Sequence, residues 1–179
     1  MLARAWGAVL SGIDAVPIRV EVDIGNGLPA LNIVGLPDVT VSEARSRVRP
    51  AIEHSGLTFP MNRITVNLAP SDLRKQGPGL DLVIALAILA ASEQLPEQGL
   101  EERIFLGELG LAGEIRGVRG SLQVAERAGV MGMRDVVVPA DNAAEASLAG
   151  VPVLGVRTLG EAVEIVRGNE PVPTSADPS

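Results

Sequence analysis

"APSDLRKQGPGLDLVIALAILAAS", which runs from Ala69 to Ser92, joins a polar turn rich in glycine to a long apolar segment. The apolar part, 82–91, has about half the length needed to cross a bilayer, so we interpret it as a buried helix. A glycine-rich turn that leads into a helix often binds phosphate or presents a nucleophile. The stretch therefore predicts a core helix whose preceding turn is a candidate functional site.

The composition favours one domain with an aliphatic core. The chain has 179 residues, of which 46% are apolar and 2% are aromatic. This length can bury a sizeable core, which must be built from Val, Leu, Ile and Ala. Cysteine is absent and His54 is the single histidine, so we expect no metal site in this chain. The first residues lack the long apolar region of a signal peptide, and we expect a cytoplasmic location and no membrane contact.

The charge distribution argues against a stand-alone nucleic-acid-binding domain. The net charge is -7, whereas such domains gain affinity by neutralising phosphates. A basic cluster nevertheless makes a candidate contact surface for DNA or for a partner domain, and its members are Arg45, Arg47, Arg49, Arg63, Arg74 and Lys75. The alternative is that these are solvated charges paired with acidic neighbours such as Glu43 and Glu53.

The order of the expected elements predicts a mixed α/β fold. Strands are expected at 5–10, 16–24, 30–34, 63–68, 103–109, 135–138 and 151–156, and helices at 41–54, 80–92, 121–128, 142–148 and 159–167. We expect Pro50 to kink or break its helix, and Ser121 and Gly129 to cap theirs. Glycines after residue 109 predict a tight turn and a return strand. The β-α-β-α order of the last half favours parallel strand pairing.

Common catalytic motifs are absent or weak. Lys75 is the single lysine and is followed by Gln76, so the chain carries no Walker phosphate loop. The glycines at 107, 110 and 113 do not have dinucleotide-binding spacing. A Ser-Lys dyad of Ser71 and Lys75, four residues apart, remains the serious catalytic alternative. No burial signal near Lys75 predicts a depressed pKa, and Arg74 beside it favours a solvated or paired ammonium.

Three long stretches together carry a resemblance to a known family. They are "NIVGLPDVTVSEARSRVRPAIEHSG", "RITVNLAPSDLRKQGPGLDLVIALAILAAS" and "GELGLAGEIRGVRGSLQVAERAG". In this order they resemble the N-terminal domain of ComM-type (YifB), magnesium-chelatase-like AAA+ ATPases. The resemblance covers nearly the whole chain up to Arg167. Because this region is similar to the proteolytic domain of Lon protease, it implies a fold of that type, an α+β (mixed α/β) arrangement related to a ribosomal-protein domain.

The resemblance also implies the surroundings of the domain. Residues 1–168 would form the Lon-like domain, and 169–179 a linker towards an AAA+ motor. That motor would bind ATP and Mg, whereas we expect no cofactor in this chain. The implied partners are the motor domain, further copies in a hexamer, and DNA, since ComM-type proteins resemble hexameric helicases that drive branch migration in natural transformation.

The same resemblance indicates that peptidase chemistry is lost. The turn that carries the Lon nucleophile corresponds to residues 77–81 here, and the nucleophile position falls on Gly79, which has no side chain. The region that corresponds to the catalytic lysine, 119–123, contains no lysine. We therefore expect no catalytic residue and a role in assembling or positioning the motor. A Ser-Lys peptidase and an accessory subunit of a chelatase-like complex remain alternatives.

Overall fold

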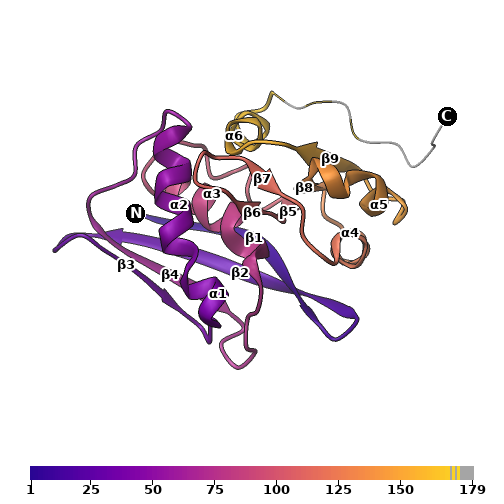
Figure 1. The fold of residues 1–179 in the computed structure, drawn as a ribbon, viewed down its shortest axis with the longest axis horizontal. Helices are drawn as coiled ribbons and strands as arrows, with labels where there is room; N and C mark the ends of the chain where they lie inside the picture. The colour runs from indigo at the N-terminus through magenta and orange to yellow at the C-terminus, as the bar shows by residue number, and fades with distance from the viewer. Residues whose placement is uncertain (170, 172, 174–179) are drawn as a thin grey trace.

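A seven-stranded sheet forms the centre of the computed structural model, which describes residues 1–169, 171 and 173 (Figure 1). The strand order in this sheet is β3-β4-β2-β1-β5-β8-β9, and β6 and β7 form a separate hairpin. The strands are β1 Leu2–Ser11, β2 Asp14–Gly25, β3 Ala30–Val34, β4 Arg63–Ala69, β5 Arg103–Phe105, β6 Glu108–Leu109, β7 Ile115–Arg116, β8 Asp135–Pro139 and β9 Val153–Val156. The α-helices are α1 Val39–Ser42, α2 Ala44–His54, α3 Asp81–Ala91, α4 Ser121–Val130, α5 Ala143–Ser147 and α6 Leu159–Val166, with 3-10 turns η1 Pro78–Leu80 and η2 Ala140–Asn142.

The strand directions divide the sheet into a mixed half and a parallel half. β1 pairs antiparallel with β2, and β2 pairs antiparallel with β4. β3 runs parallel to β4 at one edge, and β1, β5, β8 and β9 are successively parallel. The predicted mixed α/β fold and the parallel pairing of the second half are therefore confirmed. Helix α4 lies between β5 and β8 in the chain, and η2 and α5 lie between β8 and β9, as parallel neighbours require a crossover connection.

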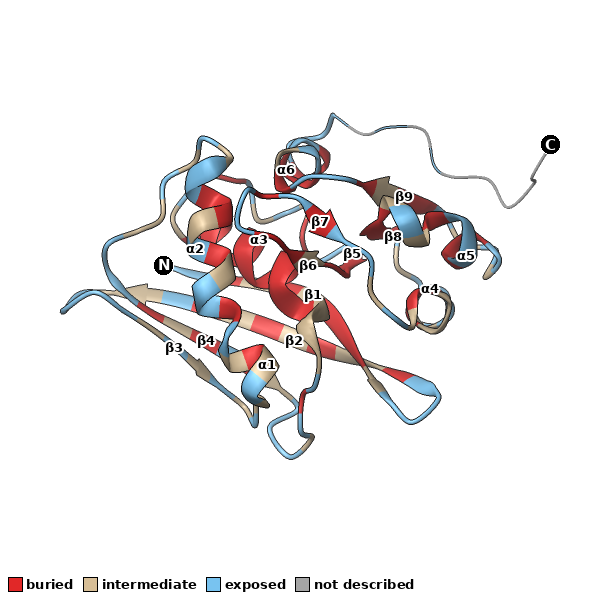
Figure 2. Cartoon of the chain, viewed as in Figure 1, coloured by how far each residue is buried: buried red, intermediate tan, exposed pale blue. Residues whose placement is uncertain are grey.

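Helix α3 is the centre of the core, and every one of its residues is buried (Figure 2). A helix that is apolar on all sides is stable only when surrounded by other elements, and α3 packs against β1, β2 and α2. A second apolar cluster lies on the other face of the sheet. Ile104 and Phe105, successive residues of β5, enter different clusters, because side chains alternate along a strand.

Two predicted elements are divided in the structure. The helix expected at 41–54 is interrupted at Glu43, which caps both α1 and α2, whereas Pro50 lies inside α2 without ending it. The proline is tolerated because Ser46, whose carbonyl loses its usual partner, is exposed to water. The strand expected at 103–109 is divided into β5 and β6. Leu106 N still donates to Val137 O on β8, but Gly107 N turns away from β8 and donates to Gly79 O.

The predicted caps of α4 are wrong. Gly120, with φ +89°, precedes the first residue, and Ser121 is buried inside the helix. The Ser121 hydroxyl contacts Glu145 instead of capping a backbone amide. The helix continues past Gly129 and ends at Val130, with Met131 as its C-cap. The expected return strand is confirmed, since β6 and β7 pair as a hairpin.

The structure bears only in part on the predicted linker and on the expectation about membrane contact. The predicted linker at 169–179 lies almost entirely outside the described residues. Within the part of the chain that the structure describes, no helix combines the length and apolar character that crossing a membrane would require.

Candidate functional site

The glycine-rich turn is held firmly against the connection between β5 and β6. Gly77 has φ +87°, a conformation that favours glycine, and Pro78 then starts the turn η1. The Gly79 carbonyl accepts a hydrogen bond from Gly107 N at 3.0 Å, and Leu82 N donates to the Gly107 carbonyl at 3.1 Å. These two bonds fix the start of α3 on the sheet.

A groove of about 640 Å³ lies beside this turn. One wall comes from the end of β1, a second from the turn itself, and a third from the segment that precedes α4. The lining therefore includes both Gly79 and Arg119, which belong to the two regions where the resemblance predicts lost catalytic groups. Asp38 and Gln76 supply further polar side chains at the groove.

The groove has the shape of a binding site without a nucleophile. A Cβ added at Gly79 would lie 3.0 Å from Leu106 Cδ1, so even a small side chain would press on its neighbour. The residues that line the groove include no serine, cysteine, lysine or histidine. Asp38 is engaged as the cap of α1, where its carboxylate accepts from Val41 N at 2.8 Å. The lining can bind a ligand, but it offers no activated group for covalent attack.

Lys75 lies inside the protein, which corrects the prediction of a solvated or paired ammonium. Its side chain is fully buried, and its Nζ donates to the carbonyl of Pro70. Burial lowers the pKa of Lys75 below its ordinary value, and the negative charge of Asp72 opposes the shift. Ser71 and Lys75 do not share a helix, since both residues lie in a loop, and Ser71 is exposed. Within the described residues, no hydrogen bond joins their side chains.

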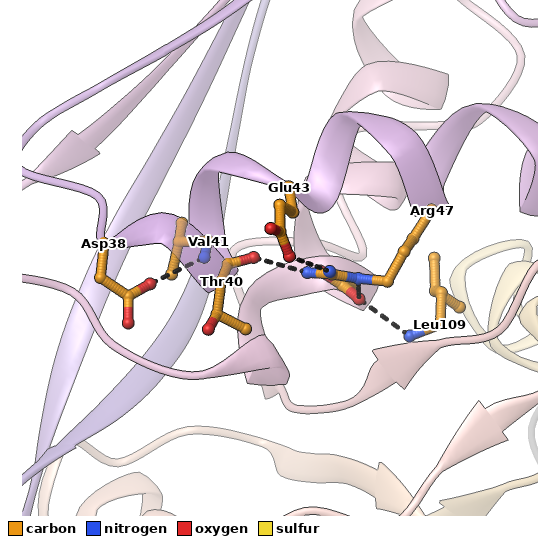
Figure 3. Close-up of polar contacts among 7 residues, drawn as sticks. Asp38, Thr40, Val41, Glu43, Arg47 and Leu109 are labelled. Carbon is orange, nitrogen blue, oxygen red and sulfur yellow. Dashed lines mark hydrogen bonds and ion pairs between the residues drawn. The ribbon is translucent and has the colours of Figure 1, made fainter.

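Arg47 is a structural residue that ties α2 to α3 (Figure 3). Its guanidinium makes two bonds to the carboxylate of Asp81, at 2.7 and 2.9 Å, and one to the Thr40 carbonyl at 2.7 Å. The Asp81 carboxylate also accepts from Leu109 N at 3.1 Å, so it joins β6 to both helices. Glu43 is a weaker partner of Arg47 at 3.9 Å. This ion pair removes Arg47 from the predicted contact surface.

The partly buried ion pair of Arg47 and Asp81 has shifted pKa values at both partners. Burial raises the pKa of Asp81 above its ordinary value, and the bonds from Arg47 and Leu109 offset that shift in part. The hydrogen bonds to Asp81 raise the pKa of Arg47 against the effect of burial. The Asp81 shift thus follows mainly from removing its carboxylate from water, and the Arg47 shift mainly from its hydrogen bonds to Asp81.

The other predicted contact residues, Arg45, Arg49, Arg63 and Arg74, are exposed. Arg45 and Arg63 line one hollow beside β3. Arg49 bonds to Glu53 at 3.2 Å, as the alternative interpretation predicts, and its guanidinium lies 5.5 Å from the centre of the Phe59 ring. Arg74 lies on the loop after β4, next to the buried Lys75. The structure therefore leaves four of the six residues available to a partner.

Two residues of the site were not predicted from the sequence. Asp81 is an acidic residue at the start of an otherwise apolar helix, and such a carboxylate needs a buried partner, which is a usable signal. Arg119 lies in the region 119–123 that the resemblance singled out, but its own place at the groove was not predicted, because it depends on the packing of distant segments. Among the described residues, no group of three or more His, Asp or Glu side chains is placed to hold a metal ion.

Comparison with known families agrees with this geometry. Residues 20–142 match the model of the ChlI subunit of Mg-chelatase, which is more than half of the chain. The chain belongs to the ChlI family. Uncharacterized protein YifB of Salmonella typhimurium is 53% identical over 76% of the chain, and competence protein ComM of Haemophilus influenzae is 40% identical over 98%. The resemblance to ComM-type proteins is thereby confirmed.

This ChlI-family chain corresponds to one part of longer proteins. It spans 27% of the length of YifB and 35% of the length of ComM. DNA repair protein RadA of Listeria monocytogenes is 31% identical over 54% of the chain, and the match covers 21% of RadA. The mixed α/β fold is compatible with the Lon-like domain type that the sequence resemblance implies. The chain is thus a ComM-like module of the Mg-chelatase family.

Proposed function

We propose that this chain is a non-peptidase module that supports the assembly and positioning of an AAA+ motor in a ComM-type DNA helicase. One observation carries the proposal: the groove beside Gly79 has a fixed turn and a largely apolar lining with the polar side chains of Asp38, Gln76 and Arg119, but no nucleophile. Such a groove can hold a segment of a partner without cutting it. The motor would bind ATP and Mg, form a hexamer and drive branch migration during natural transformation in the cytoplasm.

The ComM relative supports this proposal, because its name refers to competence and it aligns with nearly the whole chain. We propose that residues 1–168 form the module and that residues 169–179 lead towards the motor. The exposed arginines outside the ion pair are candidate contacts to DNA or to the motor. If they bind DNA, the affinity should fall steeply as the salt concentration rises.

The decisive experiment uses the full-length protein with and without residues 1–168. ATP hydrolysis and branch migration are measured for both forms, together with the sedimentation coefficient of each. We expect the deletion to lower branch migration and hexamer formation more than ATP hydrolysis per motor. Unchanged branch migration and assembly after the deletion would contradict the proposal.

A peptidase assay separates this function from its catalytic alternative. The buried Lys75 with its lowered pKa is the observation that favours a Ser71–Lys75 dyad, although the ammonium bonds to Pro70 and Ser71 faces solvent. We expect no turnover of casein by the wild type or by Gly79→Ser, since the variant regains a hydroxyl without a base. Turnover by the wild type that Ser71→Ala abolishes would establish the peptidase.

A further inference from the structure

Strand β3 is a free edge of the main sheet with little protection. It ends the strand order, and Figure 1 shows it at the lower left of the fold with no ribbon beyond it. Its sequence, ALNIV, contains no charge and no proline, and its pairing with β4 is regular over all five residues. Natural proteins usually block such edges with charges, prolines or bulges, because an open edge attracts another strand.

The register identifies which backbone groups of β3 face outwards. Ala30 N donates to Asn62 O on the β4 side, so the amides of alternate residues 30, 32 and 34 face β4. The amide and carbonyl groups of Leu31 and Ile33 therefore face away from the sheet. No hydrogen bond within the described chain occupies them. They provide two donors and two acceptors at the correct spacing for an added strand.

A continuous groove follows this edge. One hollow of about 550 Å³ and another of about 190 Å³ share Leu31 and Arg45 as lining residues, and we call them together the β3 groove. Phe59 and Met61 line the smaller hollow. Around the groove, the side chains of Leu28, Val34 and Met61 are 84%, 45% and 58% exposed. The groove thus combines a backbone edge with apolar contacts on its rim.

The charges at the β3 groove are positive. Arg45 and Arg63 line it, and neither forms an ion pair with any residue that the structure describes. The chain as a whole carries a net charge of -7, so two unpaired arginines at an apolar edge form a local exception. Guanidinium groups in such a position select carboxylates.

We propose that the β3 groove binds an extended peptide strand of a partner protein, in which apolar side chains alternate with carboxylates. The added strand would pair with Leu31 and Ile33. Its carboxylates would lie on the sheet face that carries Arg63, and its apolar side chains on the opposite face beside Leu31 and Ile33, where Arg45 adds a positive charge at the rim. This inference does not depend on the groove at Gly79 or on the function proposed for the module.

The charges favour this occupant over two others. A second copy that paired edge to edge through a two-fold axis would bring the arginines of both copies together, and like charges repel. A nucleic acid would neutralise the arginines but would leave the apolar rim exposed to water. An acidic, apolar peptide satisfies the backbone edge, the rim and the charges together.

The test uses a short fluorescein-labelled peptide in which valine alternates with glutamate, and its fluorescence anisotropy with the full chain. Ile33→Pro removes an outward amide without removing a β3–β4 hydrogen bond, and Ile33→Ala is its matched control for the lost side chain. We expect Ile33→Pro to bind roughly tenfold more weakly than Ile33→Ala, the effect of one good hydrogen bond. We expect Arg45→Gln with Arg63→Gln to weaken binding about tenfold, and Arg116→Gln, on β7, to leave it unchanged.

Further measurements keep the test decisive if Ile33→Pro does not fold. A peptide with N-methylated amides should bind the wild type at least about tenfold more weakly, because it cannot complete the strand pairing. Equal binding of a valine-lysine peptide, or equal binding by both Ile33 variants, would overturn the proposal. Two other results would also overturn the proposal. One is a dimer, seen by sedimentation, that Ile33→Pro dissociates. The other is a single-stranded oligonucleotide whose binding is weakened by Arg45→Gln with Arg63→Gln but not by either Ile33 variant.

Discussion

Removing the carboxylate of Asp81 is the sharpest test of how the turn and the helices are held together. Asp81→Ala leaves Arg47 partly buried without its two-bond partner, and it leaves Leu109 N without its acceptor. Breaking a buried pair from one side costs about 3–5 kcal/mol, because the remaining charge is uncompensated. The side chain of Arg47 is 17% exposed, so water can reach it and we expect the lower part of this range.

Replacing both Arg47 and Asp81 separates the free energy of their ion pair from the cost of leaving one buried charge without a partner. Replacing both members of a buried ion pair by apolar residues of similar volume is often neutral or stabilising, because the cost of desolvation and the attraction are removed together. Arg47→Met with Asp81→Leu should therefore unfold within about 1 kcal/mol of the wild type, whereas each single change should be costly.

Urea unfolding followed by circular dichroism measures these free energies, and thermal melting provides a check. A loss of about 3 kcal/mol corresponds to a decrease in melting temperature of roughly 6–12 °C for a domain of this size. Arg49→Ala with Glu53→Ala, an exposed pair one helical turn apart on the same helix, serves as the matched control and should change stability by less than about 1 kcal/mol. If Asp81→Ala costs no more than this control, or if the double variant is as unstable as the sum of the singles, the reasoning is wrong.

Further variants test the buried charges and the backbone. Asp81→Asn removes a titrating group whose pKa is raised in the folded state. The folded wild type loses stability as the pH rises from the ordinary carboxyl pKa through that raised pKa, whereas the variant does not. The difference in unfolding free energy between the two should therefore shrink as the pH rises. Urea midpoints over acidic pH check this, and a difference that grows with pH would contradict it. Lys75→Met should be neutral or stabilising near pH 7 and should lose that advantage in alkaline solution. Because the pKa of Lys75 is lowered in the folded state, the wild type gains stability as the pH rises towards the ordinary lysine pKa. Melting curves across alkaline pH measure this, and a strongly destabilised variant would show that the ammonium is required. Gly35→Ala should cost at least about 3 kcal/mol, since Gly35 has φ +110° and an added Cβ would overlap the Leu68 carbonyl; urea unfolding measures the loss, and a near-neutral result would contradict this backbone geometry.

The elements with strong periodicity could be predicted from the sequence, whereas their ends could not. The alternation around 16–24 and the apolar run after Leu80 correspond directly to β2 and α3. The strand predicted at 103–109 ends early because Gly107 bonds to Gly79, a residue far away in the chain. No local pattern encodes such a bond, so the boundary depends on tertiary contacts.

The candidate site shows the same division. The sequence by itself determined that Gly79 carries no nucleophile and that residues 119–123 contain no lysine, because side-chain chemistry is read directly from residue identity. Only the tertiary structure decided which charges are available: it buried Lys75, paired Arg47 with Asp81 and left Arg45 and Arg63 at an open sheet edge. The physical reason is that burial and pairing depend on which distant segments pack together, and these determine whether a charge faces solvent or an opposite charge.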